Sequence, residues 1–333
     1  MRSGINIPCG VSDGRMKMSL LKIENAVKRY QSGGHLHSKT VLAVRGVSLR
    51  LEQGECLAIV GESGSGKSTL GRLAVGLEPP TEGRILFKGK ELNAKRMDRG
   101  VRQALQMVYQ NSFEATNPRF TARQVIEEPI RYFHLAPKSD WNARIDALLV
   151  RVGIPVEEAG KRTYEFSGGQ LQRICIARAL AASPELILLD EPLSSLDVSV
   201  QAQILNLLKK LKEEDGLTYM LISHDLETVY NLADRLAVMY YGKVVEEIDT
   251  MDLFDVLCHP YTTLLTGKDF AVNGQQDSEE RREGCVYAAR CAKATDDCRH
   301  TAPALVEIEP GHRIACHRFA QAEKSTSNEG DMS

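Results

Sequence analysis

The sequence predicts an α/β fold in which helices cover both faces of a parallel sheet. Three short apolar runs are typical of buried strands: residues 56–60, 186–189 and 219–222. Each run is followed by glycine or a polar residue, and helical patterns separate the runs along the chain. Strands that alternate with helices favour a parallel sheet that is buried on both faces.

The segment before the first run predicts an antiparallel β subdomain. A strand-like pattern begins at Leu20, a glycine-rich break follows at Gly33–Gly34, and residues 41–51 alternate between apolar and polar side chains. This alternation is typical of half-buried strands. Residues 1–18 are polar and contain glycine, so we expect a flexible N-terminus there.

Helix formers dominate after Gln110, as in residues 141–152, and they predict an inserted helical subdomain over about residues 111–175. A second helical pattern covers residues 200–211, with its leucines and isoleucine on one side. Late strands are expected around a turn within residues 238–246. Together with the three runs, these elements define one main domain.

The composition changes after about Asp255, and we expect the main domain, residues 19–255, to end there. Residues 256–320 predict a small C-terminal extension that holds four of the eight cysteines. Part of it, residues 267–284, is polar and linker-like. Residues 321–333 have low complexity and predict a disordered tail.

The overall composition excludes several classes of protein. The chain has 333 residues, 43% of them hydrophobic, and a net charge of −2, which gives no basic surface for nucleic acid. No stretch reaches about eighteen continuous apolar residues, as a membrane span requires. The first residues lack the apolar segment of a signal peptide, so we expect a cytoplasmic protein whose cysteines are thiols or metal ligands.

A glycine-rich loop follows the first apolar run and fits the pattern G-x-x-x-x-G-K-[ST] over residues 61–68. In such a loop the backbone N–H groups converge on phosphates, the lysine reaches the β- and γ-phosphates, and the hydroxyl ligates Mg²⁺. The strand before it and the helix expected over residues 69–77 supply the required context. The predicted nucleotide-binding residues here are Gly61, Ser63, Gly64, Ser65, Gly66, Lys67, Ser68 and Thr69.

Acidic residues end the second apolar run. Asp190 is a candidate Mg²⁺ ligand beside Ser68, and Glu191 can orient or deprotonate an attacking water. Many strands also end in acids at a solvent edge, so the pair alone is weak evidence for a nucleotide site. In combination with the glycine loop it becomes strong evidence. His224 closes the third run, where a structural and a catalytic role are equally open.

Three further features lie elsewhere along the chain. Ser167-Gly168-Gly169-Gln170 is a second glycine turn, followed by a long helical run. Gln110 precedes the helical insertion. Tyr30 can stack on an adenine ring, although a half-buried strand tyrosine is the commoner case.

These elements, in this order, resemble the ABC (ATP-binding cassette) ATPase family over about residues 20–255. The order is Tyr30, the phosphate loop, Gln110, Ser167–Gln170, Asp190-Glu191, Ser194-Ser195-Leu196-Asp197 and His224. The resemblance implies a P-loop NTPase fold and ATP with Mg²⁺. It further implies that Glu191 is the general base, that His224 contacts the γ-phosphate, and that Gln110 joins Mg²⁺ or water and signals to a membrane subunit.

The same resemblance implies that this chain forms half of each ATP site. Ser167, Gly168, Gly169, Gln170 and Asp197 are expected to act across a dimer interface on the nucleotide of a partner. Phe166 departs from the family, in which leucine is usual at that position. The contacts of this motif come from its serine and glycines, so the change is expected to be tolerated.

A narrower resemblance is to the oligopeptide/dipeptide/nickel importer subfamily. Its residues are Asn117-Pro118-Arg119, the run 198–203 and His259-Pro260-Tyr261-Thr262. It implies a peptide importer on the cytoplasmic face of the inner membrane, with a paralogous second ATPase subunit, two permease subunits and an extracytoplasmic solute-binding protein. A nickel or metal-chelate importer and a soluble, non-transport ABC ATPase are the alternatives. Ser112, where proline is usual, and residues 114–116 depart from the subfamily.

Four cysteines crowd into the extension at spacings x5, x6 and x17: Cys285, Cys291, Cys298 and Cys316. Four thiolates suit an iron–sulfur cluster or a structural zinc, and zinc knuckles usually have tighter C-x₂₋₄-C spacings. The subfamily resemblance implies a [4Fe-4S] cluster. Zinc, nearby histidine ligands and plain reduced cysteines are the alternatives. In sequence the cysteines lie too far from the nucleotide motifs to assign them a step in hydrolysis.

Overall fold

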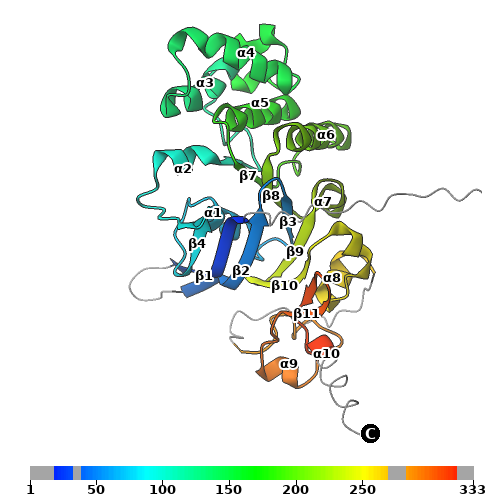
Figure 1. Cartoon of the computed structure of the whole chain (residues 1–333). Coiled ribbons are helices and arrows are strands. Elements are labelled where there is room, and N and C mark those ends of the chain that lie inside the picture. Colours follow the sequence, from blue (N-terminus) through cyan, green and yellow to red (C-terminus); the bar gives the residue numbers. More distant parts are fainter. Residues whose placement is uncertain (1–18, 33–38, 269–282, 321–333) are drawn as a thin grey trace, which may run out of the picture.

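A computed structural model describes residues 19–32, 39–268 and 283–320 of the chain (Figure 1). The predicted flexible N-terminus, the glycine break at Gly33–Gly34, most of the linker-like segment 267–284 and the predicted disordered tail lie outside the described residues.

The core of the fold is an eight-stranded sheet of order β11-β12-β10-β9-β3-β8-β7-β6. The five strands from β6 to β9 in this order are parallel, as predicted, and β10, β12 and β11 continue the sheet in antiparallel pairs. Their bounds are β3 Cys56–Val60, β6 Leu105–Val108, β7 Leu186–Asp190, β8 Thr218–Ser223, β9 Arg235–Tyr240, β10 Lys243–Ile248, β11 Val306–Glu309 and β12 His312–Ile314. The sequence analysis missed β6, because four residues are too few to show a periodicity.

Helices pack on this sheet from the segments between its strands. They are α1 Lys67–Ala74, α6 Val198–Asp215 and α7 Leu226–Leu232. Helix α1 packs closely: a Cβ at Gly71 would lie 2.7 Å from the Ile222 side chain and 2.9 Å from that of Leu188. The helix expected over residues 69–77 begins earlier and ends earlier, because Gly76 adopts a left-handed φ of 67°.

A separate four-stranded antiparallel sheet of order β2-β1-β4-β5 covers the other side of α1, which confirms the predicted antiparallel subdomain (Figure 1). Its strands are β1 Ser19–Ser32, β2 Lys39–Glu52, β4 Glu82–Phe87 and β5 Lys90–Glu91. Buried residues such as Leu21, Ile23 and Val44 face Leu70 and Leu73 of α1 in one apolar cluster. This cluster holds α1, and with it the glycine loop, between two sheets.

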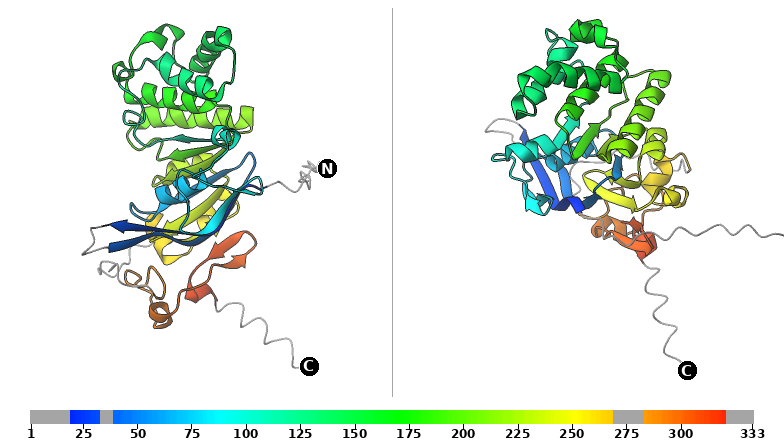
Figure 2. Two further views of the ribbon diagram at one scale, coloured as in Figure 1. Left: turned by 90° about the vertical axis from the view of Figure 1, so that its left-hand side faces the viewer. Right: turned by 45° about the horizontal axis from the view of Figure 1, so that its top comes forward.

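The helical insertion forms a subdomain at one end of the molecule (Figure 2). Its helices are α3 Ala122–Phe133, α4 Trp141–Arg151 and α5 Gly168–Ala181, with 3₁₀ turns at Lys138–Asp140, Val156–Gly160 and Thr163–Glu165, and α2 Arg99–Ala104 precedes it. A capping box between Thr121 and Gln124 begins α3. Ile126, Leu149 and Ile174 are buried together, so one apolar cluster joins the three helices.

The C-terminal extension lies at the opposite end of the molecule in both views of Figure 2. Its elements besides β11 and β12 are a 3₁₀ turn Met251–Val256, α8 Pro260–Leu265, α9 Asp297–His300 and α10 His317–Ala320. Strand β12 pairs with β10, so the chain after residue 283 returns to the central sheet. The extension is thus continuous with the core.

A buried charged pair fastens β12 to β10. Nε2 of His312 lies 2.8 Å from Oε1 of Glu246, and its Nδ1 lies 3.1 Å from Oε1 of Glu309. Burial opposes the charged imidazolium, but the two carboxylates outweigh it and raise the pKa of His312. Cys258 lies beside this pair, and its backbone N–H donates to Glu246. Because both ring nitrogens of His312 already face carboxylates, we interpret the group as an ion pair.

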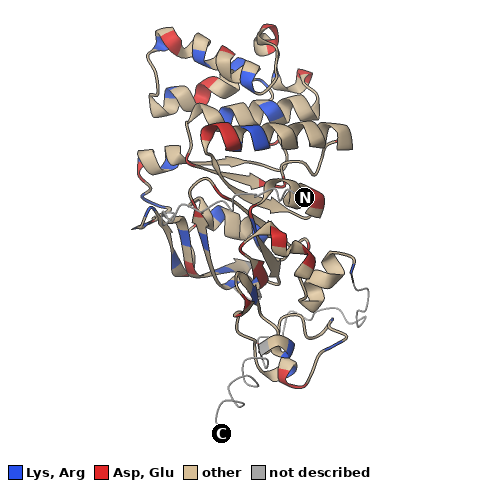
Figure 3. Ribbon diagram, turned by 45° about the vertical axis from the view of Figure 1, so that its right-hand side comes forward, with Lys and Arg blue, Asp and Glu red and all other residues tan. Residues whose placement is uncertain are grey.

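Basic and acidic residues are interspersed along the ribbon of the described residues (Figure 3). Within the same residues, no helix combines the length and the apolar character that crossing a bilayer demands.

Candidate active site

The glycine loop connects β3 to α1, as the sequence predicted. Its backbone takes left-handed φ values at Gly61, Gly64 and Gly66. A Cβ at Gly61 would lie 2.1 Å from the carbonyl oxygen of Met239, and one at Gly66 would lie 2.1 Å from that of Ala43. Glycine is therefore required at both positions by close backbone approach as well as by conformation.

The Lys67 ammonium lies inside the loop. Its Nζ donates to the carbonyl oxygens of Gly61 at 2.7 Å and Glu62 at 2.8 Å. Burial lowers the pKa of Lys67, and the nearby carboxylates of Glu191 and Asp190 oppose that effect. A bound anion would give this buried cation a charged partner in place of two carbonyls.

Strand β7 brings Asp190 beside the start of α1. The Ser68 hydroxyl donates to Oδ1 of Asp190 at 3.0 Å. Burial raises the pKa of Asp190, while the Ser68 hydrogen bond opposes that rise. A hydroxyl and a carboxylate are hard oxygen ligands, so the donor set suits Mg²⁺.

Glu191 is the meeting point of two other predicted residues. Nε2 of Gln110 donates to Oε2 of Glu191 at 2.9 Å, and Nδ1 of His224 lies 3.3 Å from the same oxygen. The backbone of Glu191 is left-handed, with a φ of 47°, and such strain concentrates at functional sites. These three residues follow β7, β6 and β8, whose carboxyl ends meet at one edge of the parallel sheet.

A cavity of about 1630 Å³ lies over this edge. The predicted residues that line it are Ser63, Gly64, Gly66, Lys67, Ser68, Thr69, Gln110, Glu191 and His224. Gly61, Ser65 and Asp190 belong to the adjoining backbone and buried layer and are not part of that lining.

The cavity also has lining residues that the sequence analysis missed. Arg29, Arg45 and Tyr241 contribute to its wall, and the Arg45 guanidinium lies 4.1 Å from the centre of the Tyr241 ring. Nothing in the sequence marks these residues, because they reach the cavity from strands β1 and β2 and from the turn between β9 and β10.

Tyr30 is placed differently from the prediction. Its hydroxyl donates to Oε2 of Glu78 at 2.7 Å, and the Lys28 ammonium lies 5.1 Å from its ring centre. Tyr30 does not belong to the cavity lining formed by the described residues, whereas its neighbour Arg29 does. Tyr30 nevertheless lies beside the cavity, because its side chain also contacts Thr69, which is part of the lining.

The second glycine turn begins α5, apart from this cavity. Ser167 is exposed and forms a capping box with Gln170, through bonds of 3.3 Å and 3.1 Å. Gly169 is needed there because a Cβ would lie 2.3 Å from a methyl group of Val200. Asp197, which begins α6, is also exposed. Thus Ser167 and Asp197 face solvent, and the second motif does not contribute to the cavity of its own chain.

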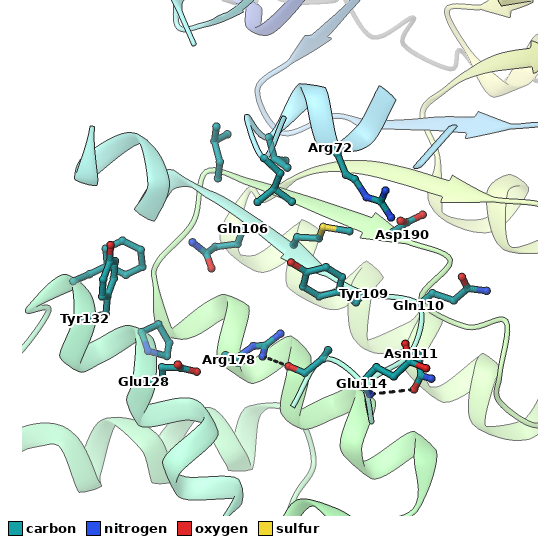
Figure 4. Close-up of a pocket in the computed structure, with 17 residues that line it drawn as sticks. Arg72, Gln106, Tyr109, Gln110, Asn111, Glu114, Glu128, Tyr132, Arg178 and Asp190 are labelled. Atoms are coloured by element: carbon teal, nitrogen blue, oxygen red, sulfur yellow. Dashed lines mark hydrogen bonds between the residues drawn. The ribbon is translucent and has the colours of Figure 1, made fainter. Parts of the chain in front are cut away.

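A second groove, of about 860 Å³, runs from the catalytic edge to the helical subdomain. Figure 4 shows Arg72, Asp190 and Gln110 at one end of it and Glu128 and Tyr132 at the other. Two of its aromatic residues are exposed: Tyr109 by 41% and Tyr132 by 56%. The groove therefore offers a partly apolar surface next to Gln110.

The four cysteines of the extension come together in space. The backbone N–H of Cys285 donates to the carbonyl of Cys298 at 2.8 Å. Burial, together with the other three cysteines of the group, raises the pKa of the Cys285 thiol to about 11. Among the described residues, only Glu246, Cys258 and His312 bring three ligand atoms within 4.8 Å of one another. No three of the four sulfurs therefore lie within 4.8 Å of one another.

Comparison with known proteins identifies the family. Residues 44–194 match the family described as ABC transporter, and residues 245–298 match the oligopeptide/dipeptide transporter C-terminal region. The oligopeptide transport ATP-binding protein AppF of Bacillus subtilis is 44% identical over 84% of this chain and 90% of its own length. The chain belongs to the ABC transporter family of ATP-binding proteins.

Two further relatives support the assignment of this chain to the ABC transporter family. The oligopeptide transport ATP-binding protein OppF of Salmonella typhimurium is 38% identical over 90% of this chain and 95% of its own length. A dimeric post-hydrolysis structure of the ATP-binding cassette MJ0796, bound to ADP and Pi, is 31% identical, with a TM-score of 0.61 over 68% of this chain and 97% of that one. The predicted P-loop NTPase fold and ATPase activity are thereby confirmed.

Proposed function

We propose that this protein is the ATP-hydrolysing subunit of a peptide importer. The observation that carries the proposal is the convergence of Gln110 and His224 on one oxygen of Glu191, beside the Ser68–Asp190 pair. The peptide cargo is supported by relatives named for oligopeptide transport, which match most of the chain.

The proposed roles follow from the geometry. The loop 61–68 binds the phosphates through its N–H groups, and Lys67 exchanges its two carbonyl partners for phosphate oxygens. Ser68 and Asp190 hold Mg²⁺, which neutralises phosphate charge when bound. Glu191 accepts a proton from the attacking water, and Gln110 and His224 fix its carboxylate.

The second motif implies a partner ATPase subunit, which we propose is a paralogue. Ser167 and Asp197 are exposed, and the whole motif lies outside the cavity of this chain, so its serine is available to a nucleotide held by the partner. The adenine position proposed for Tyr30 requires its side chain to leave Glu78 when nucleotide binds. Residues 19–255 then act as the ATPase domain, and residues 256–320 as the importer-type extension.

The groove of Figure 4 is the proposed contact with the membrane permeases. It joins exposed aromatic residues to Gln110 and Asp190, so a permease segment seated there would touch the catalytic edge directly. Such contact places the protein peripherally on the cytoplasmic face of the membrane. An extracytoplasmic solute-binding protein would complete the importer.

Cys285, Cys291, Cys298 and Cys316 are proposed to hold a [4Fe-4S] cluster. The support is their mutual proximity, since four thiolates suit such a cluster. Anaerobically purified protein should contain iron and sulfide and absorb visible light through thiolate-to-iron bands. A Cys298→Ser variant should lose most of that absorption. Protein that carries zinc, or neither metal, would contradict the cluster.

The proposed function is tested by peptide uptake in cells that carry Lys67→Ala in place of the parent protein. Loss of the ammonium should weaken ATP binding about 10- to 100-fold, since hydrogen bonds to charged groups are each worth about 1.5–3 kcal/mol. Uptake of labelled peptides should fall accordingly. Lys210→Ala, at an exposed lysine of α6, is the matched control.

The same cells should also be given a nickel chelate. Uptake of nickel that depends on Lys67, with peptide uptake unchanged, would overturn the peptide assignment in favour of a metal-chelate importer. ATP hydrolysis without co-purification of any membrane protein would favour the non-transport alternative.

A further inference from the structure

The extension reaches the phosphate loop itself. Glu62 is the second residue of the loop, and its carboxylate makes a two-bond ion pair with Arg290, at 2.7 Å and 3.1 Å. Arg290 directly precedes Cys291 in the cysteine segment, residues 283–300. Two-point guanidinium–carboxylate pairs fix geometry as well as charge. A residue 228 positions away thus sets where the Glu62 side chain lies.

A second contact from the extension holds the backbone of the same residue. The N–H of Glu62 donates to the hydroxyl oxygen of Tyr261 at 2.7 Å. Tyr261 is fully buried and is the second residue of α8, in the His-Pro-Tyr motif. Side chain and backbone of Glu62 are therefore both held by residues outside the ATPase core.

The support for these contacts is an aromatic cluster of Tyr240, Tyr261 and Tyr287. The ring of Tyr240 lies 4.5 Å from that of Tyr261 and 5.2 Å from that of Tyr287, measured between centres. The Arg290 guanidinium lies 5.9 Å from the ring centres of Tyr240 and Tyr287. Large packed rings are rigid, so Arg290 is presented from a fixed platform.

The pair matters because of where Glu62 lies. Its carbonyl oxygen accepts from the Lys67 ammonium at 2.8 Å, so the residue that Arg290 holds is in direct contact with the phosphate-binding lysine. An unpaired carboxylate in an anion-binding loop would repel the phosphates. Arg290 neutralises this charge and keeps it turned toward the extension.

We infer that Arg290 is a positioning residue of the phosphate loop, through which the folded cysteine segment controls ATP affinity. The inference rests on the proposed function in one respect, namely that loop 61–68 binds the ATP phosphates. The extension then affects nucleotide binding, and in addition it contributes strands β11 and β12 to the central sheet.

The test measures binding of a non-hydrolysable ATP analogue with Mg²⁺ to the purified full chain by calorimetry. Arg290→Ala should raise the Kd about tenfold, which is the loss expected for a charge-assisted pair. Glu62→Gln removes the repelling charge, so the double variant should return to within about threefold of the parent. Arg299→Ala, at an exposed arginine of the same segment, should leave the Kd unchanged.

A purely structural role for Arg290 predicts a different pattern. In that case the double variant binds no better than Arg290→Ala, and this result would overturn the inference. An unchanged Kd in Arg290→Ala would also overturn it, provided that Lys67→Ala loses binding in the same assay. If Lys67→Ala binds normally, the loop assignment itself is wrong. Should Arg290→Ala not fold, Arg290→Lys, which keeps the charge and loses the two-point geometry, should give a smaller rise in Kd.

The link between the cysteine segment and Arg290 is tested by combining variants and asking whether their effects on the Kd add. Cys291→Ser should raise the Kd in the parent background and have little further effect in Arg290→Ala, because both changes release the same contact. Fully additive effects would show that the cysteines influence binding by another route, or only through general stability, and would overturn control through Arg290.

Discussion

Replacing Glu191 by Gln should lower the rate of ATP hydrolysis by about 10²- to 10⁴-fold, the contribution typical of a general base. The amide has nearly the shape of the carboxylate but cannot accept the proton of the attacking water. Gln110 and His224 both lie against the oxygen that the substitution affects. Lys67 and Ser68 are untouched, so ATP binding should persist, and the variant should accumulate in the ATP-bound state.

The measurement is steady-state phosphate release, with nucleotide binding measured in parallel on the same preparation. Glu227→Gln, at an exposed glutamate of α7, makes the same chemical change away from the cavity and should keep full activity. Rapid turnover by Glu191→Gln would refute the assignment of the base. Loss of binding together with turnover would instead indicate a damaged phosphate site.

Replacing Arg235 by Ala should destabilise the fold by about 3–5 kcal/mol, the usual result of removing one partner from a buried ionic network. Arg235 begins β9, and its side chain is only 7% exposed. It contacts the carboxylates of Glu55 at 3.0 Å, Glu247 at 2.9 Å and Asp249 at 3.0 Å. Without the guanidinium, these acids would remain together inside the sheet without their central cation.

Urea unfolding, followed by circular dichroism, measures this loss. Lys210→Ala breaks an exposed pair with Glu214 and should cost no more than about 0.5 kcal/mol. Arg235→Lys should be intermediate, since the ammonium keeps the positive charge but lacks the planar, five-donor geometry of the guanidinium.

The loss of folding stability in Arg235→Ala should also depend on pH. Burial raises the pKa of Glu247, opposed by Arg313 and Arg235, so removing Arg235 raises it further. An acid with a raised pKa in the folded state holds a proton that the unfolded chain releases near pH 4.5, and folding then weakens as the pH rises. The variant should accordingly be closest to the parent below about pH 4.5 and should fall further behind it as the pH rises to neutral. A pH-independent deficit would contradict this explanation.

The nucleotide residues could be predicted because each motif is contiguous and its chemistry is local. A glycine loop of this pattern between a buried strand and a helix is typical of phosphate binding, so residues 61–68 could be recognised without tertiary information. Asp190, Glu191 and His224 each follow an apolar run, and parallel strands bring their carboxyl ends to one edge. These residues were predicted one by one, and the structure showed that Gln110 and His224 meet at one oxygen of Glu191.

Other features depended on pairing between distant segments. Strand β6 was too short to recognise, and Arg45 and Tyr241 reach the cavity from separate hairpins with no local pattern. Tyr30 was expected to stack on adenine, yet in the structure its hydroxyl bonds to Glu78, a partner 48 residues away. A strand pattern shows that neighbouring side chains alternate, but not which of the two faces is turned to the cavity.

The sequence by itself determined that this chain is an ATPase with a phosphate loop, an acidic pair and a second glycine motif, because short motifs carry that chemistry in consecutive residues. Only the tertiary structure decided what the C-terminal extension touches. Strand β12 joins the central sheet beside β10, and Arg290 reaches Glu62 across 228 positions. Such contacts depend on strand pairing and on the packing of three tyrosines, neither of which any local pattern encodes.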